Sequence, residues 1–145
     1  MTRMQASSAT PFDKVRRDHA HETAEDYAEA IADIVHEHGE CRVKDLVGHM
    51  GVSHVTVTRI VGRLQRRGLV ETAPYRPIRL TADGERLAAR SHRRHELVLA
   101  FLRALGVPEA DAHRDTEGIE HHVSAATLER MAAFLDPPEE SEGSR

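Results

Sequence analysis

The chain has 145 residues, enough for one compact domain or two small units. Its single cysteine, Cys41, excludes a framework of intramolecular disulfides, and no apolar run approaches the roughly 18 residues of a membrane-spanning helix. The first twenty residues show no hydrophobic core of a secretory signal, so we expect a cytoplasmic location and no membrane partner.

The net charge of −4 conceals an uneven distribution along the chain. Residues 42–94 contain 12 Lys or Arg against 4 Asp or Glu, whereas residues 95–145 contain 4 against 11 and residues 1–41 contain 4 against 9. A basic centre between acidic flanks favours a DNA-facing module joined to segments with another role.

Residues 1–20 offer few apolar anchors and no clear period, and we expect a flexible N-terminal arm there. Between His21 and His38 apolar residues recur at helical spacing, and Gly39 supplies the stop. The same helix carries an acidic stripe well away from its apolar one. By spacing alone such a stripe is typical of a solvated face. Its members are Glu22, Asp26, Glu29 and Asp33.

Residues 41–70 contain two short amphipathic segments joined by Gly51, and Ser53 can cap the second one. Two helices about a glycine turn, the second rich in Arg, predict a helix-turn-helix. Residues 69–81 then predict strand, turn and strand, a hairpin with prolines at its tip. A hairpin directly after a helix-turn-helix is typical of a winged-helix domain, with an unrelated hairpin as the alternative.

The second of these helices, residues 54–67, carries polar side chains opposite its apolar stripe. Residues near the start of a recognition helix reach base edges, and His54, Val55, Thr56 and Arg59 are expected nearest the bases. Arginines farther along, and the one at the wing, are better placed to bind phosphate. Each arginine alone can be a solubilising charge, but together they coincide with the predicted DNA-facing elements. The predicted DNA-binding residues are Ser53, His54, Val55, Thr56, Thr58, Arg59, Arg63, Arg66 and Arg76.

Three more helices are predicted, over 83–105, about 109–122, and from a cap at Ser124 to the Asp-Pro-Pro that starts at Asp136. The segment at 115–124 is DTEGIEHHVS. In a helix, Glu117, Glu120 and His121 lie at i, i+3 and i+4 and project from one face. Such a face can coordinate a divalent cation, and an ordinary wet surface is the alternative.

Three segments carry a resemblance to a known family: DYAE at 26–29, RRHELVLAFLRALGV at 93–107 and DTEGIEHHVS at 115–124. With the helix-turn-helix and hairpin in the expected order, residues 22–135 resemble the manganese-responsive branch of the diphtheria toxin repressor family. The resemblance implies a metal-activated homodimeric repressor, not an enzyme, that binds palindromic operator DNA and controls manganese-uptake genes. No organic cofactor is implied.

Carried over by position, the resemblance implies two Mn²⁺ ions per subunit. The implied ligand set has four carboxylates and two imidazoles, which suit a six-coordinate ion such as Mn²⁺. It contains no cysteine, which disfavours a structural zinc site. The iron-sensing branch has a sulfur ligand where this chain has Glu117. Fe²⁺, Zn²⁺ and Cd²⁺ are expected competitors. Apart from the resemblance, His95 would be interpreted as a core histidine beside the apolar stripe. The implied ligands are Asp26, Glu29, His95, Glu117, Glu120 and His121.

The expected fold is therefore mainly α with a small β-hairpin wing. It divides into a flexible arm (1–20), a winged helix-turn-helix DNA-binding domain (21–82), a helical metal-binding and dimerisation domain (83–136) and a disordered acidic tail (137–145). Two other functions stay open. One is a winged-helix regulator that responds to iron, zinc or an organic ligand. The other is a two-metal hydrolase, disfavoured because no separate base or substrate loop stands out.

Overall fold

The computed structural model describes residues 10–137. The chain divides between Glu85 and Arg86 into two compact units, three residues beyond the expected boundary. The described residues form helices and one antiparallel hairpin, which confirms the expected fold class. Among these residues no helix combines the length and apolar character that a membrane crossing requires.

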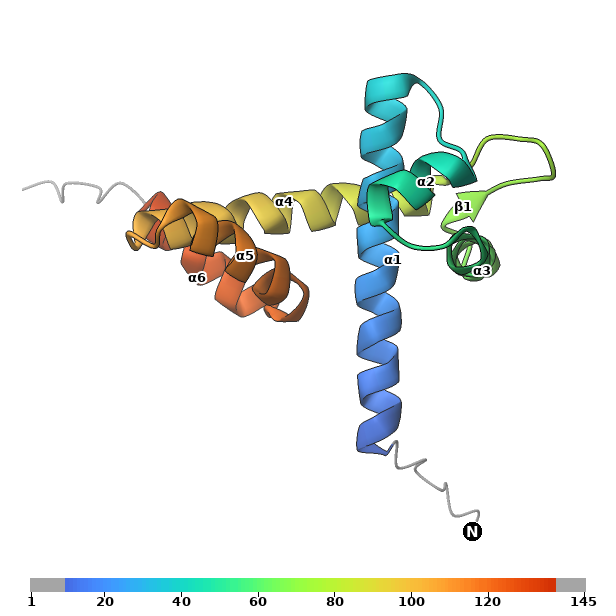
Figure 1. The fold of residues 1–145 in the computed structure, drawn as a ribbon. Helices are drawn as coiled ribbons and strands as arrows, with labels where there is room; N and C mark the ends of the chain where they lie inside the picture. Colours follow the sequence, from blue (N-terminus) through green and yellow to red (C-terminus); the bar gives the residue numbers. More distant parts are fainter. Residues whose placement is uncertain (1–9, 138–145) are drawn as a thin grey trace, which may run out of the picture. The chain divides into compact units, whose positions relative to one another are not determined.

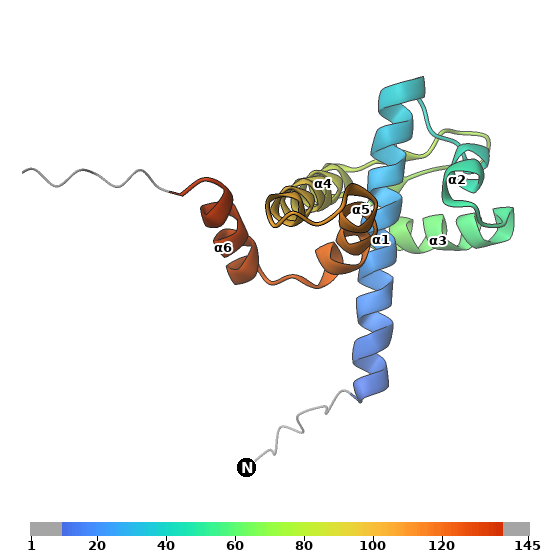
Figure 2. The ribbon, with the colours of Figure 1, turned by 60° about the vertical axis from the view of Figure 1, so that its left-hand side comes forward.

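The first unit contains three helices and the hairpin: α1 (Pro11–His38), α2 (Val43–Met50), α3 (His54–Arg66), β1 (Val70–Glu71) and β2 (Arg79–Leu80). The smaller elements lie on one side of α1, and the N-terminal half of α1 extends beyond them (Figures 1 and 2). Apolar side chains from α1, α2, α3 and β1, with one from the residue just before β2, meet in the core of the unit. Fully buried examples are Ile31, Leu46, Val57, Val70 and Ile78.

The first helix corrects one expectation, because α1 begins at Pro11, ten residues before the predicted start at His21. Half of the segment predicted to be a flexible arm is thus helical. The cause is a capping box: the Thr10 hydroxyl accepts from the backbone N–H of Asp13 at 3.3 Å, and the Asp13 carboxylate accepts from the backbone N–H of Thr10 at 3.2 Å. A proline at the first helical position adds to this start. Residues 1–9 of the predicted arm and 138–145 of the predicted tail lie outside the described residues.

The hairpin is shorter than the 69–81 span predicted for it. Its strands pair over only two residues each, because prolines near the tip cannot donate to a ladder. Two contacts hold it to the loop before α2. The backbone N–H of Ile78 donates to the Cys41 carbonyl at 2.7 Å, and the Arg42 guanidinium donates to the Tyr75 carbonyl at 3.3 Å. Tyr75 is 99% exposed at the tip.

The start of α4 (Ala82–Ala104) packs tightly against the two residues that precede β1, Gly68 and Leu69. The Thr81 hydroxyl donates to the Gly68 carbonyl at 2.6 Å and accepts from the backbone N–H of Gly84 at 3.1 Å. A β-carbon on Gly84 would lie 2.0 Å from the Leu69 carbonyl oxygen. Only glycine fits this position.

The second unit consists of the rest of α4, α5 (Glu109–Ile119), the short 3₁₀ helix η1 (Glu120–His122) and α6 (Ala125–Leu135). The predicted helix over 109–122 thus changes from α to 3₁₀ geometry for its last three residues. Figure 1 shows α5 and α6 beside the C-terminal end of α4. The rings of Phe101 and Phe134 meet edge to face with centroids 5.5 Å apart, which joins α4 to α6.

Candidate metal centre and nucleic-acid interface

Three of the six predicted metal ligands lie together in the second unit. They are His95 of α4, Glu117 in the last turn of α5 and Glu120 at the start of η1. Their potential ligand atoms all lie within 4.8 Å of one another. The His95 Nδ1 atom lies 2.5 Å from a Glu120 oxygen and 3.8 Å from a Glu117 oxygen. Residues separated by more than twenty positions therefore share one small volume.

The local backbone places Glu120 at the centre of this cluster. The Arg94 guanidinium donates to the Glu120 carbonyl at 3.2 Å and so connects η1 to α4. The second oxygen of the Glu120 carboxylate lies 3.3 Å from Nε2 of His121. The Glu120 side chain is only 3% exposed, whereas that of Glu117 is 68% exposed. Glu120 is thus a buried carboxylate between the imidazoles of His95 and His121, and Glu117 is a second, exposed carboxylate beside His95.

The donor set of this cluster fits a divalent cation. A buried carboxylate is stable only with hydrogen bonds or a compensating charge. Neutral imidazole offers one ring nitrogen as a ligand, and carboxylate oxygens are the ligands that manganese, calcium and magnesium prefer. Cys41, the chain's one thiol, belongs to the other unit's core. Oxygen and nitrogen ligands at this spacing favour a hard to intermediate ion.

Of the three remaining predicted ligands, His121 lies in η1 beside Glu120, whereas Asp26 and Glu29 belong to α1 in the first unit. Both are partly buried, and their i, i+3 spacing places them on the same side of the helix. The two residues between them, Tyr27 and Ala28, are buried. The contribution of Asp26 and Glu29 to a shared metal site with His95, Glu117 and Glu120 stays a prediction.

An ion pair on α1 was not anticipated. The His21 Nε2 atom lies 2.7 Å from Oε1 of Glu25, whose side chain is fully buried. The sequence shows only an i, i+4 His–Glu spacing, which is common on exposed helices. Burial is the property that distinguishes this pair, and periodicity alone did not assign Glu25 to the buried face.

The predicted DNA-binding residues lie on and around the exposed surface of α3. Thr56 is partly buried, and Arg76 lies in the wing. Val55, at the start of the helix, is 76% exposed although apolar. An exposed aliphatic group at this position can contact a thymine methyl group. The eight exposed residues are Ser53, His54, Val55, Thr58, Arg59, Arg63, Arg66 and Arg76.

Ser53 has a structural role in addition to any contact with DNA. Its hydroxyl accepts from the backbone N–H of Thr56 at 3.2 Å and donates to the Thr56 hydroxyl at 2.9 Å. This N-cap satisfies one of the free donors at the start of α3. The cap therefore sets the first turn from which His54 and Val55 project.

Tyr27 brings the α1 segment with the predicted ligands into electrostatic contact with α3. Burial raises the pKa of the Tyr27 hydroxyl, and the positive charge of Arg59 partly offsets that rise. Within residues 10–137 this buried hydroxyl has no hydrogen-bond partner. A predicted base-reading arginine thus lies close enough to α1 to influence the residue that follows Asp26.

Two protein-family models match the chain, one over each of its two units. Residues 19–78 match the N-terminal DNA-binding domain of iron-dependent repressors. Residues 81–144 match the metal-binding and dimerisation domain of the same repressors. The helix-turn-helix and the His95–Glu117–Glu120 cluster therefore fall in domains of the corresponding kind.

Curated relatives and solved structures agree with these matches. The transcriptional regulator MntR of Escherichia coli O6:H1 is 46% identical over 123 residues, which cover 85% of this chain and 79% of the relative. The regulator MntR of Bacillus subtilis strain 168 is 36% identical over 118 residues, covering 81% and 83%.

The solved structure of the manganese regulator SloR superposes with a TM-score of 0.69 at 31% identity over 79% of this chain. ScaR with bound Zn²⁺ gives a TM-score of 0.68 at 29% identity over the same share. The chain spans about half the length of these two solved proteins, 54% in each case. From the two matched domains and the extended similarity to MntR proteins, the chain belongs to the diphtheria toxin repressor family of metal-dependent transcriptional regulators, in its MntR branch.

Proposed function

We propose that this chain is a Mn²⁺-activated repressor that binds palindromic operator DNA as a homodimer and controls manganese-uptake genes. The observation that carries the proposal is the gathering of His95, Glu117 and Glu120 in a chain that also presents a helix-turn-helix. The relatives named as MntR, and the solved manganese regulator SloR, support manganese as the effector.

We assign Asp26, Glu29 and His121 as the remaining ligands. This assignment rests on the resemblance of DYAE and EGIEHH to the family's motifs and on the i, i+3 spacing in α1. When bound, Mn²⁺ supplies positive charge opposite the four carboxylates, and six donor residues suffice for two neighbouring ions. Solved forms of the relative ScaR carry Zn²⁺ or Cd²⁺, which supports these two ions as competitors here. Fe²⁺ is a third proposed competitor, because it lies next to Mn²⁺ in the order of divalent-metal affinities.

The DNA contacts follow from the arrangement of α3 and the wing. His54, Val55, Thr56 and Arg59 lie near the start of the recognition helix, from which side chains reach base edges. Arg63, Arg66 and Arg76 are assigned to phosphates. A homodimer has two such helices related by a twofold axis, which is why a palindromic operator is the matching target.

The decisive test removes the charge of Glu120 with little change of shape. We expect Glu120→Gln to keep the helical circular dichroism spectrum of the wild type and to lose Mn²⁺-dependent operator binding in a gel-shift titration. Glu96→Gln is the matched control, because Glu96 also pairs with a histidine, His92, at 3.0 Å but lies outside the cluster. Unchanged Mn²⁺ dependence in Glu120→Gln would refute the assigned metal centre.

A second experiment addresses the identity of the metal. Operator binding is titrated separately with Mn²⁺, Fe²⁺ and Zn²⁺ under anaerobic conditions. Mn²⁺ has the weakest intrinsic affinity of the three, so selectivity must come from coordination geometry rather than from tight binding. We expect the fullest activation with Mn²⁺, and activation by Fe²⁺ or Zn²⁺ alone would transfer the chain to the iron- or zinc-responsive alternative.

A further inference from the structure

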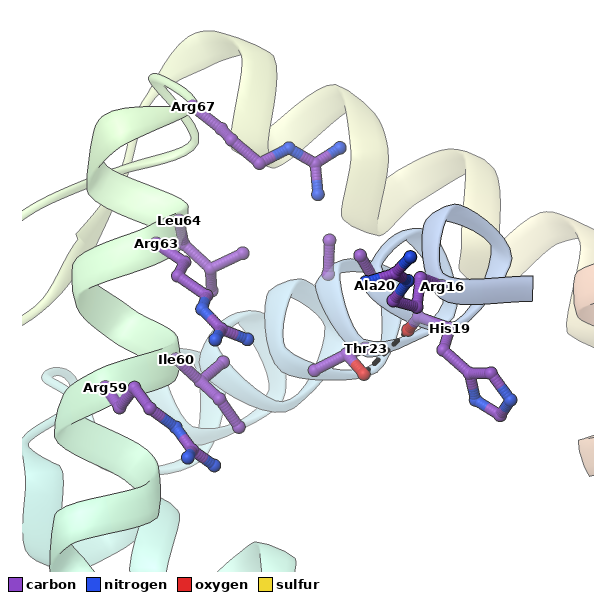
Figure 3. A pocket seen from close by; sticks show the side chains of 10 residues that line it. Arg16, His19, Ala20, Thr23, Arg59, Ile60, Arg63, Leu64 and Arg67 are labelled. Atoms are coloured by element: carbon purple, nitrogen blue, oxygen red, sulfur yellow. Dashed lines mark hydrogen bonds between the residues drawn. The ribbon is translucent and has the colours of Figure 1, made fainter. Parts of the chain in front are cut away.

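An open groove of about 440 Å³ lies between the N-terminal half of α1 and the recognition helix α3, within the first unit. Figure 3 shows the arginines of α3 extending into it, with Arg16 and Thr23 on the opposite wall. The floor is apolar and includes Ile60 and Leu64. Arg16 and Arg67 were given no function by the sequence.

The groove carries positive charge with little compensation. No acidic residue lines it among the residues that the structure describes. Arg16 pairs with Asp13 on its own helix at 2.7 Å. The side chains of Arg59, Arg63 and Arg67 form no ion pair with any carboxylate within residues 10–137. Several unpaired guanidinium groups facing one space favour an anionic occupant.

The spacing of these charges favours an extended anion over a compact one. Beyond the base-reading Arg59, Arg63 of α3 and Arg67 at its C-cap lie one turn apart, a row about 6 Å long at the rise of an α-helix. Each strand of B-DNA carries one phosphate per roughly 3.4 Å of its axis, so a row of this length faces more than one phosphate. The apolar floor offers no donors that could surround a single small ion.

The extension of α1 adds a second wall that the rest of the unit does not require. Nearly all of residues 11–20 are exposed, and this part of the helix projects past α2, α3 and the hairpin (Figures 1 and 2). A helix end with so few buried side chains gains little from packing and is held by its capping box. Its basic side chain, Arg16, reaches the groove all the same.

We propose that this groove binds the sugar–phosphate backbone of the operator, in addition to the base contacts made from the start of α3. Arg16 and Arg67 are then phosphate-binding residues, and Arg63 acts from the same surface. The inference rests on the proposed function, because its partner is the same DNA. The N-terminal extension of α1 then contributes to DNA affinity through phosphate contacts, which do not depend on base sequence.

The salt dependence of DNA affinity measures this contact directly. Fluorescence anisotropy is recorded at saturating Mn²⁺ with an operator duplex and a scrambled duplex, from 50 to 200 mM salt. In the proposed homodimer each substitution removes two phosphate contacts, so we expect Arg16→Ala and Arg67→Ala each to reduce the slope of log affinity against log salt by about 1.8 on both duplexes. Over this fourfold change of salt, each variant should lose about 12-fold less affinity than the wild type. Arg16→Lys keeps the charge and should keep the wild-type slope.

Arg114→Ala is the matched control, because Arg114 forms the same exposed i, i+3 pair with Asp111 at 2.6 Å but lies in α5. Unchanged slopes in both groove variants, with normal Mn²⁺-dependent binding by the wild type, would overturn the groove assignment alone. Absence of Mn²⁺-dependent binding by the wild type would overturn the proposed function and this inference with it. Calorimetry with inorganic phosphate tests whether the groove binds a small free anion instead. If the wild type binds phosphate, Arg67→Ala does not, and the salt slope of DNA affinity is unchanged in that variant, then the groove is a small-anion site and not a DNA contact.

Discussion

At position 84 a β-carbon would lie 2.0 Å from the carbonyl oxygen of Leu69, closer than any van der Waals contact allows. Gly84→Ala must therefore move the start of α4 away from Leu69, the residue before β1, and overpacking of this kind costs about 1–3 kcal/mol. Urea unfolding of the metal-free protein measures the loss. Gly48→Ala in α2 is the control, since no atom lies within 4 Å of the added methyl group and alanine favours the helix. Equal stability of the two variants would contradict the contact.

The thiol of Cys41 gives a pH-dependent prediction. Burial, with a smaller contribution from the nearby Asp45 carboxylate, raises its pKa from an ordinary 9.0 to about 12. The folded protein therefore keeps the proton that the unfolded chain loses, so the stabilising effect is complete below about pH 9 and declines as the pH rises toward 12. We expect iodoacetamide to label Cys41 at pH 8.5 in urea and not in buffer. Rapid labelling of the folded protein would contradict this burial.

Single residues also show what sequence could and could not provide about the site. His95, Glu117 and Glu120 were recognised from motif resemblance and helical spacing, and the structure brings their side chains together. Arg16 and Arg67 were missed, because their relevance comes from a groove between two helices. No one-dimensional pattern shows which arginines on separate helices face the same space.

Among the helices, α3 depends most visibly on one cap. Ser53→Ala removes the acceptor for the Thr56 N–H and should cost about 1 kcal/mol of stability, whereas Ser53→Asn restores a cap and should recover it. Chemical unfolding provides the measurement, with operator affinity recorded alongside. If Ser53 acted on DNA alone, stability would be the same in all three proteins, and that result would reject the structural role.

The boundaries of helices were predictable where a glycine or a cap stood beside a buried face. Gly39 ends α1 in the left-handed conformation, and Ser124 caps α6, both as predicted. The start of α1 was missed because residues 11–20 bury almost nothing, so no apolar period marks them. The change to 3₁₀ geometry at Glu120 was missed because both helix types use the same residues and differ in hydrogen bonding.

For the whole molecule, α6 is the element to which we assign the contact of the proposed homodimer. It has no fully buried residue among its described positions, and Phe134 is 60% exposed. The match of residues 81–144 to a metal-binding and dimerisation domain supports this assignment. We expect Phe134→Glu to sediment as a 16.2 kDa monomer and the wild type at twice that mass.

Ala132→Glu is the control for this experiment, because Ala132 is exposed on roughly the opposite face of α6. It should remain dimeric. Circular dichroism of Phe134→Glu is needed alongside, because Phe134 also contacts Phe101. Dimeric sedimentation of a folded Phe134→Glu variant would place the interface elsewhere.

The 28 residues of α1 form a rod about 42 Å long. Asp26 and Arg16 lie ten positions apart on it, about 15 Å along the axis. A stiff rod acts as a lever, so a tilt of about 10° around Asp26 would sweep Arg16 through about 2.6 Å, a distance as long as a hydrogen bond. A change of tilt at the segment that carries Asp26 is thereby transmitted to the turn that carries Arg16, with no loop between them.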